Sequence, residues 1–450
     1  MKGTFNYRLR SLMLPGLKRW ILVIFFGIAF IVFGVFLLMG YHPLTLTGSF
    51  LREIMENAAD VLPHRISGFI VITGGALILC LAIVRITLAV VGAYLPQDRE
   101  PILDVLYRRR HLDRGPKIVV IGGGTGLSNL LKGLKNYTNN ITAIVTVGDD
   151  GGSSGRLRQE LGVLPPGDIR NCITALADEE KLVTELFRYR FEAGEGLEGH
   201  SFGNLFLTAI CSITNGDMLQ ATRVASRVLN SCGQVLPSTL RSITLVAKMR
   251  DGEIVKGESQ ITKTAGQIER IFSEPSAEAT PEAVEAIRTA DLIILGPGSL
   301  YTSIVPNLLI EGIPEAIRKA KAHKVYVCNV MTQVGETINY SVADHLKALL
   351  IHSDTPPHQA NKFIQTVLVN DEIPDLSKYH SQNSPVYFDP ERIKEYGINI
   401  VKEPLLSSTL INHHDSDKLA KLIVLSFLNP KKHRPLELRR KDGSLHSSIA

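Results

Sequence analysis

The chain has 450 residues, more than one ordinary domain contains, and its 45% hydrophobic and 21% charged residues are typical of a folded protein and not of a disordered one. The formal net charge of +5 is too small to indicate a nucleic-acid partner. The five cysteines stand far apart with no CxxC pair, so the sequence predicts reduced thiols and no zinc site or disulfide framework.

Two apolar runs at the start of the chain predict a membrane anchor. The first, at about residues 20–39, carries no charge, and about 20 helical residues cross a bilayer core of roughly 30 Å. The second, at about residues 67–90, is interrupted by Arg85, whose long side chain can reach the membrane interface. A cleaved signal peptide is the alternative, but the first run is too long and no small-x-small cleavage site follows it.

Most basic residues near the two runs lie before the first run or after the second. Five precede the first run and five arginines follow the second, so the positive-inside rule predicts that both ends face the cytoplasm. We therefore expect residues 1–95 to form a two-helix hairpin in the plasma membrane, a multi-pass anchor with the large domain in the cytoplasm. Residues 96–116 are expected to form a basic juxtamembrane linker, either solvated or resting on anionic lipid headgroups.

From residue 117 to about residue 430, short apolar strands alternate with helical stretches. The strand segments are "KIVVIG", "ITAIVTVG", "SITLVAKM", "DLIILG", "KVYVCNV" and "FIQTVLVN". This alternation predicts a Rossmann-like α/β domain, a mostly parallel sheet with helices on both faces that binds its ligand at the carboxyl ends of the strands. Residues 431–450 are expected to form a basic C-terminal tail.

Two glycine-rich turns follow predicted strands. In the first, "GGGTG" opens a helix, where backbone amides can approach a phosphate. Leu127 stands where a dinucleotide fingerprint needs its third glycine, and no Walker lysine follows, so a tight structural turn remains the alternative. The second turn is "GPGSLYT". The candidate ligand-binding residues of these turns are Gly123, Gly124, Thr125 and Gly126, and Gly298, Ser299, Tyr301 and Thr302.

The run "TVGDDGGSSGRLRQELGVLPPGDIRNC" carries the charged candidates. Asp149 and Asp150 follow a strand end, where carboxylates can hold Mg²⁺ or accept hydrogen bonds from sugar hydroxyls. Arginines 156, 158 and 170 can bind phosphate oxygens with their forked guanidinium groups. His200 has no evident carboxylate partner and is interpreted as structural, and Asn204 is either a ligand contact or a helix cap. Tyr340 can stack on a base, bond a phosphate or simply pack.

Together, "GGGTGLSNLL", "TVGDDGGSSGRLR", "LPPGDIRNC", "GHSFGNL", "LGPGSLYTSIVPNLL" and "MTQVGET" resemble the CofD/YvcK-like family, within it the gluconeogenesis factor branch, from about Lys117 to about Leu428. The resemblance implies a domain that binds UDP-sugars, notably UDP-N-acetylglucosamine, and supports cell-envelope growth and cell shape. It implies no required cofactor and leaves homo-oligomerisation open. By motif it matches Tyr379 to a tyrosine of the UDP-sugar site. The candidate ligand-binding residues are thus those of both turns together with Asp149, Asp150, Ser154, Arg156, Asp168, Asn171, Asn204, Tyr340 and Tyr379.

Two functions of different class follow from the resemblance. The first is a membrane-anchored UDP-sugar-binding regulator without catalysis. The second is a magnesium-dependent phosphotransferase similar to 2-phospho-L-lactate transferase, with Asp149 and Asp150 on the metal. An arginine that partners Tyr379 in the UDP-sugar branch has no counterpart here, where His413 stands near its place.

Overall fold

The computed structural model describes residues 17–38, 64–94, 110–177, 181–374, 383–408 and 413–428. The chain divides into two compact units, Met1–Tyr107 and Arg108–Ala450. The candidate Tyr379, residues 96–109 of the expected linker and the expected tail lie outside the described residues.

The first unit contains two apolar helices, α2 (Leu17–Leu38) and α4 (His64–Tyr94). Arg19–Leu38 and Arg65–Ala89 are long and apolar enough to cross a membrane by length and composition. The helices pack closely through glycines, because a Cβ atom on Gly34 would lie 2.9 Å from the carbonyl oxygen of Gly68. The Arg85 guanidinium lies 5.8 Å from the ring centroid of Trp20, a cation–π contact within the pair.

The second unit is built on a seven-stranded sheet in the order β10-β9-β8-β7-β1-β2-β3, with all neighbours parallel. Its strands are β1 (Ile118–Gly122), β2 (Ile141–Val145), β3 (Gln234–Pro237), β7 (Leu292–Leu295), β8 (His323–Val327), β9 (Thr366–Asn370) and β10 (Asn399–Glu403). Every residue of β1, β2 and β7 is buried, as expected for strands covered on both faces. The predicted parallel α/β fold is confirmed.

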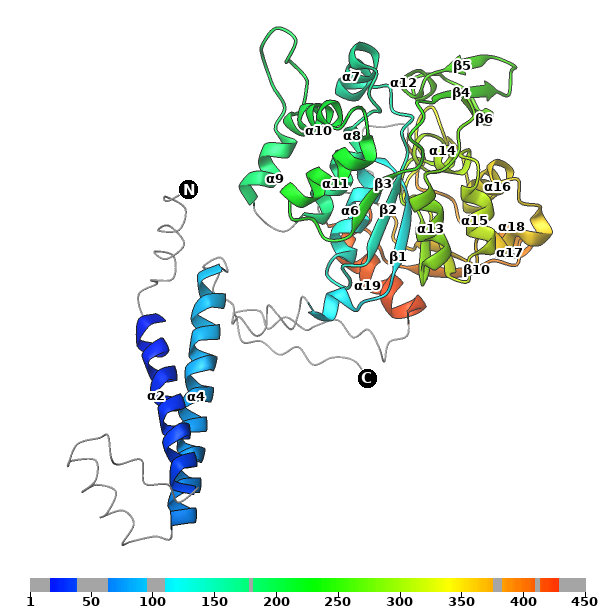
Figure 1. Ribbon diagram of the computed structural model, residues 1–450. Helices are drawn as coiled ribbons and strands as arrows, with labels where there is room; N and C mark the ends of the chain where they lie inside the picture. Colours follow the sequence, from blue (N-terminus) through cyan, green and yellow to red (C-terminus); the bar gives the residue numbers. More distant parts are fainter. Residues whose placement is uncertain are drawn as a thin grey trace. The chain divides into compact units, whose positions relative to one another are not determined.

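Helices cover both faces of this sheet (Figure 1). One layer contains α6 (Gly124–Leu134), α8 (Gly167–Leu176), α11 (Met218–Val228) and α19 (Ser416–Phe427), and the other contains α13 (Pro281–Thr289), α14 (Val305–Leu308), α15 (Ile313–Lys319) and α16 (Val342–His352). The further helices are α7 (Gly152–Leu161), α9 (Lys181–Arg188), α10 (Phe202–Ile213), α12 (Glu258–Ile261), α17 (Ala360–Phe363) and α18 (Pro390–Lys394), with a π-helical turn η1 (Leu300–Ile304) and a 3₁₀ turn η2 (Pro357–Gln359).

A smaller antiparallel sheet is inserted between β3 and β7. It consists of β4 (Thr244–Met249), β5 (Ile254–Lys256) and β6 (Ile268–Glu274), with β4 in the middle. The interpretation of "SITLVAKM" as a strand of the parallel sheet is therefore wrong. The turn at Asp251 and Gly252 joins β4 to β5 within a few residues, and so short a connection permits only antiparallel pairing. Strands β3 and β10 of the main sheet were not predicted.

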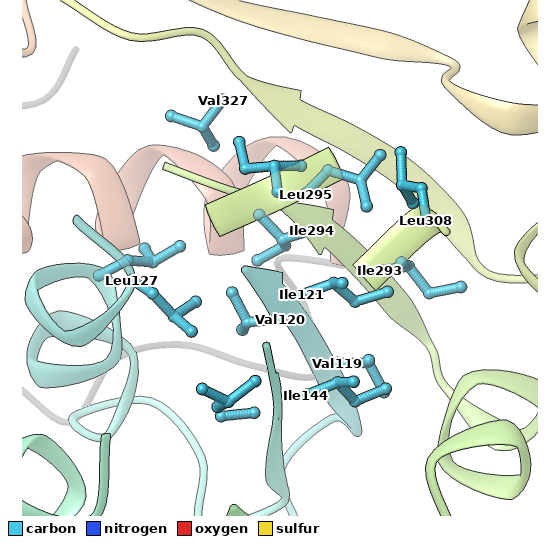
Figure 2. Close-up of a cluster of buried hydrophobic side chains, with 14 of the residues drawn as sticks. Val119, Val120, Ile121, Leu127, Ile144, Ile293, Ile294, Leu295, Leu308 and Val327 are labelled. Carbon is cyan, nitrogen blue, oxygen red and sulfur yellow. The ribbon is translucent and has the colours of Figure 1, made fainter. Parts of the chain in front are cut away.

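The core places the candidate site at a defined edge of the sheet. Buried side chains of the central strands, among them Val120, Ile121 and Ile294, pack together with Leu127 of α6 (Figure 2). From β1 the chain continues to β2 on one side, whereas β7 lies on the other. The strand order thus reverses between β1 and β7, the position at which doubly wound sheets open a crevice at the carboxyl ends of their strands.

Candidate functional site

The two glycine turns pack directly against each other. A Cβ atom on Gly126 would lie 2.8 Å from the carbonyl oxygen of Pro297, and one on Gly298 would lie 3.1 Å from the carbonyl oxygen of Gly123. The first distance is shorter than a side-chain carbon tolerates, and the second would require the Gly123 carbonyl to move by a few tenths of an ångström. Gly126 and Gly298 are therefore needed for contact between the turns, whatever ligand lies above them.

The start of α6, where the sequence predicts a phosphate, already has a carboxylate beside it. The backbone amide of Gly124, a residue with φ +65°, donates a hydrogen bond to Asp168 of α8. A Cβ atom on Gly123 would lie 2.6 Å from Asp168 Oδ2, so this glycine makes room for the carboxylate. Burial, and then the negative charge of Asp149, raise the pKa of Asp168 to about 6.

The start of η1, after the second glycine turn, also has a carboxylate. Glu336 is buried and accepts hydrogen bonds from the Tyr301 amide at 2.9 Å and from Thr302 Oγ1 at 2.8 Å. Burial raises the pKa of Glu336, and the hydrogen bonds oppose that rise. Sequence reasoning missed Glu336; its only signal was a place in the quoted motif "MTQVGET", because its partners lie 34 and 35 residues away.

The hydroxyl candidates of the second turn bond within the protein. Tyr301 Oη and Tyr340 Oη are 3.0 Å apart in a buried pair, and Ser299 Oγ accepts a hydrogen bond from Gln333 Nε2 at 3.0 Å. The structure thus brings these residues together as internal partners. Their contact with a ligand stays a prediction.

Asp149 and Asp150 begin an acidic cluster at the carboxyl end of β2. Asp149 Oδ1 accepts the Gly151 amide and Asp150 Oδ1 accepts the Ser259 amide of α12, both at 2.8 Å. Glu258 of α12 lies beside them, and burial followed by the charges of Asp149 and Asp150 raises its pKa to about 8. We define the acidic cluster as Glu258 and the four carboxylates that act on it electrostatically, which are Asp149, Asp150, Asp168 and Glu336.

A buried polar group joins α7 to α10. Asn204 Nδ2 donates to Ser153 Oγ at 3.0 Å, and a second hydrogen bond joins Ser153 Oγ to His200 Nδ1 at 2.9 Å. Burial, and then Arg156, lower the pKa of His200, which agrees with a neutral structural histidine. Ser201, not Asn204, caps α10 by accepting the Asn204 amide.

The other small polar candidates bond to α8. Ser154 Oγ accepts the Gly167 amide at 3.1 Å and so ties α7 to the start of α8. Asn171 Oδ1 accepts a hydrogen bond from Arg170 Nη2 at 2.7 Å. Both residues hold neighbouring groups in place around the acidic cluster, and a direct contact with ligand stays a prediction.

The three candidate arginines have different surroundings. Arg158 Nη2 donates to the Ile243 carbonyl at 2.6 Å and to Thr244 Oγ1 at 3.1 Å, so this side chain fastens α7 to the inserted sheet. Arg156 Nη2 donates to the Glu198 carbonyl at 2.6 Å, and Arg170 Nη1 donates to Ser201 Oγ. Two of the three arginines therefore point to the segment before α10, and the third does not.

Comparison with known proteins identifies the family. The model of the 2-phospho-L-lactate transferase CofD family matches residues 118–406, the span that carries both glycine turns and the acidic cluster. The chain belongs to the CofD family. A "Putative gluconeogenesis factor" from Nostoc is 49% identical over 419 residues, which are 91% of each chain. The "Gluconeogenesis factor" of Bacillus subtilis is 51% identical over 69% of this chain and 97% of its own.

The fold of this CofD family member also agrees with a solved relative. A crystal structure of a Bacillus halodurans protein is 46% identical, with a TM-score of 0.66 over 69% of this chain and all of that chain. The Nostoc match, with 419 aligned residues, is longer than the second unit and so extends into the N-terminal unit. Relatives therefore occur both with and without a counterpart of that unit.

One hollow in the described structure is lined by residues outside these motifs. It has a volume of about 480 Å³ and opens beside the end of β3, between Thr239, Arg241, Glu278 and Glu311. No member of the acidic cluster lines it. We therefore place the candidate site at the carboxyl ends of β1, β2 and β7, where the family motifs converge.

Proposed function

We propose that this protein is a membrane-anchored binding protein for a UDP-sugar, with UDP-N-acetylglucosamine as the first candidate, that serves as a regulator of cell-envelope growth and cell shape. Its α/β unit faces the cytoplasm, and its two N-terminal helices hold it in the plasma membrane. The gluconeogenesis factors among its relatives support the regulatory role. The apolar length of α2 and α4 supports the anchor.

The observation that carries the proposal is the juxtaposition of carboxylates and arginines at one edge of the sheet. Asp149 and Asp168 act electrostatically on Arg170, so acidic and basic groups are neighbours. Carboxylates accept hydrogen bonds from sugar and ribose hydroxyls, and guanidinium groups bind phosphate oxygens. A nucleotide sugar presents both kinds of group in one molecule.

The second candidate is a magnesium-dependent phosphotransferase. It is favoured by the family model, which is named for 2-phospho-L-lactate transferase, and by the adjacent carboxylates of Asp149 and Asp150. Such oxygens suit Mg²⁺, although one oxygen of each carboxylate already accepts a backbone amide. A bound Mg²⁺ would neutralise the charge of a phosphoryl group in transfer.

Calorimetric titration of the full-length protein in detergent with UDP-N-acetylglucosamine separates the two candidates. The matched variant is Asp149→Asn, because Asp149 acts on both Asp168 and Glu258 and asparagine keeps the oxygen that accepts the Gly151 amide. If Asp149 accepts a ligand hydroxyl, the variant should lose about 1.5–3 kcal/mol of binding free energy, with magnesium or with a chelator.

A different result would support the transferase. Binding or turnover of the wild type that strictly requires magnesium, together with loss of that requirement in Asp149→Asn, would overturn the regulator proposal. Absence of any heat with UDP-N-acetylglucosamine, GDP and NAD alike would overturn the proposed ligand class.

A further inference from the structure

The glycine turns are poorly suited to bind a phosphate group. At the first turn the Gly124 amide already donates to Asp168, and at the second the Tyr301 amide and the Thr302 hydroxyl donate to Glu336. A phosphate at either helix start would have to displace a carboxylate of the chain itself. The neighbouring charges of the acidic cluster would repel it further, as the raised pKa of Glu258 indicates.

Three arginines from separate elements meet a few residues away. Arg156 of α7 donates to the Glu198 carbonyl, Arg190 after α9 donates to the Gly199 carbonyl, and Arg170 of α8 donates to Ser201 Oγ. Their partners are neutral and lie within one short segment, residues 198–201, which continues into α10. We call Arg156, Arg170 and Arg190 the arginine triad.

The charge of the triad is not balanced by ion pairs. Within the described parts of the chain, no ion pair joins Arg156, Arg170 or Arg190 to a carboxylate. Burial, and then the positive charge of Arg190, lower the pKa of Arg170, and the Nε atom of Arg170 is buried without a hydrogen-bond partner. Like charges held together in this way favour an anion between them.

We propose that the arginine triad, and not the glycine turns, binds the diphosphate of the ligand. This inference rests on the proposed function, and it adds Arg190, which sequence reasoning missed because it stands 20 and 34 residues from its two partners. The triad borders the acidic cluster through Arg170, on which Asp168 and Asp149 act. The ligand is therefore oriented with its phosphates on the triad and its hydroxyls toward Asp149 and Glu258.

The segment at residues 198–201 assembles the triad. Arg190 and Ser201 also form an isolated antiparallel bridge, so the chain on both sides of the loop at residues 191–200 is held together. Gly199 has φ +78°, and a Cβ atom there would lie 3.0 Å from Arg156 Nη2. Glycine at this position allows the guanidinium group of Arg156 to approach the backbone.

The test uses the full-length protein in detergent with four probes: UDP-N-acetylglucosamine, UDP, uridine and inorganic pyrophosphate. The variants are Arg156→Gln and Arg190→Gln, in which glutamine keeps one N–H donor for the carbonyl partner. Arg227→Gln is the matched control, because Arg227 is exposed, is not among the charges that act on Arg170 and loses the same charge. Melting temperatures within about 2 °C of wild type show that each variant is folded.

Each triad variant should bind pyrophosphate, UDP and UDP-N-acetylglucosamine at least tenfold more weakly, and uridine unchanged, because a charge-assisted hydrogen bond to phosphate is lost. Arg227→Gln should change these affinities less than threefold. Wild-type affinity for pyrophosphate in both triad variants, or an equal loss in Arg227→Gln, would overturn the inference.

The same titrations distinguish failure of the inference from failure of the proposed function. If the wild type binds pyrophosphate through the triad but does not bind UDP-N-acetylglucosamine, the anion site stands and the proposed ligand is wrong. If the triad variants bind UDP-N-acetylglucosamine as tightly as the wild type does, the proposed ligand stands and the role of the triad is wrong. If the wild type binds neither pyrophosphate nor UDP-N-acetylglucosamine, both proposals are wrong.

Discussion

Replacement of Glu258 by glutamine should stabilise the protein at high pH and leave it unchanged at low pH. Glu258 begins α12 and lies beside Asp149 and Asp150. Burial and these neighbours raise its pKa to about 8 in the folded protein, whereas the ordinary value is 4.5. Glutamine has nearly the same shape but cannot ionise.

The sign of the effect follows from proton binding. Below about pH 4.5 the carboxyl group is neutral in both folded and unfolded chains, so it does not lower the free energy of unfolding. Between about pH 4.5 and pH 8 the unfolded chain releases its proton and the folded one retains it, so stability falls as pH rises. Above about pH 8 Glu258 is ionised in the folded wild type, which therefore has lost the full amount of stability, whereas Glu258→Gln has lost none.

The size of this cost can be worked from the two pKa values. The difference corresponds to ~5 kcal/mol at 1.36 kcal/mol per pKa unit, and solvent screening of a partly exposed side chain reduces it to about 2–3 kcal/mol. For a unit of this length, 1 kcal/mol shifts the melting temperature by about 2 °C, so the variant should melt roughly 4–6 °C higher at pH 9.

The assay is thermal unfolding of the full-length protein at pH 5, 7 and 9, followed by circular dichroism. Tryptophan fluorescence is unsuitable, because the single tryptophan, Trp20, lies in α2 of the other unit. Glu253→Gln, a change of an exposed glutamate in the turn between β4 and β5, is the matched control. A difference between Glu258→Gln and wild type that stays constant from pH 5 to pH 9 would refute an electrostatic origin.

Two further predictions concern the turn and the anchor. Gly126→Ala should destabilise the protein by about 1–3 kcal/mol, because its methyl group meets the Pro297 carbonyl. Gly124→Ala, at φ +65° but without such a contact, should destabilise the protein by about 1–2 kcal/mol. Urea unfolding measures both changes, and wild-type stability of Gly126→Ala would contradict the contact between the turns. A reporter fused after Ala450 should be active only if its activity requires the cytoplasm, and activity of a periplasmic reporter at that place would contradict the hairpin.

The sequence located most strands of the main sheet. Uninterrupted apolar runs such as those of β1, β2 and β7 are typical of strands buried on both faces, and the structure confirms them. It also located the two glycine turns and the adjacent aspartates, since these are local patterns that follow strand ends. The short edge strands β3 and β10 were missed, because neither is uniformly buried and so neither reads as an apolar run.

The sequence by itself determined that this chain has an apolar N-terminal pair of helices, a parallel α/β unit and glycine turns at strand ends. Each of these features depends on residues that are close together in the sequence. Only the tertiary structure decided what those turns face. Asp168 is 44 residues from Gly124, and Glu336 is 35 from Tyr301, yet each carboxylate bonds the helix start that a phosphate would need. Likewise, the three arginines of the triad are far apart in the sequence, and only the tertiary structure shows that all of them donate hydrogen bonds to residues 198–201. Local patterns show which groups are present, but the order of the strands decides which of them meet.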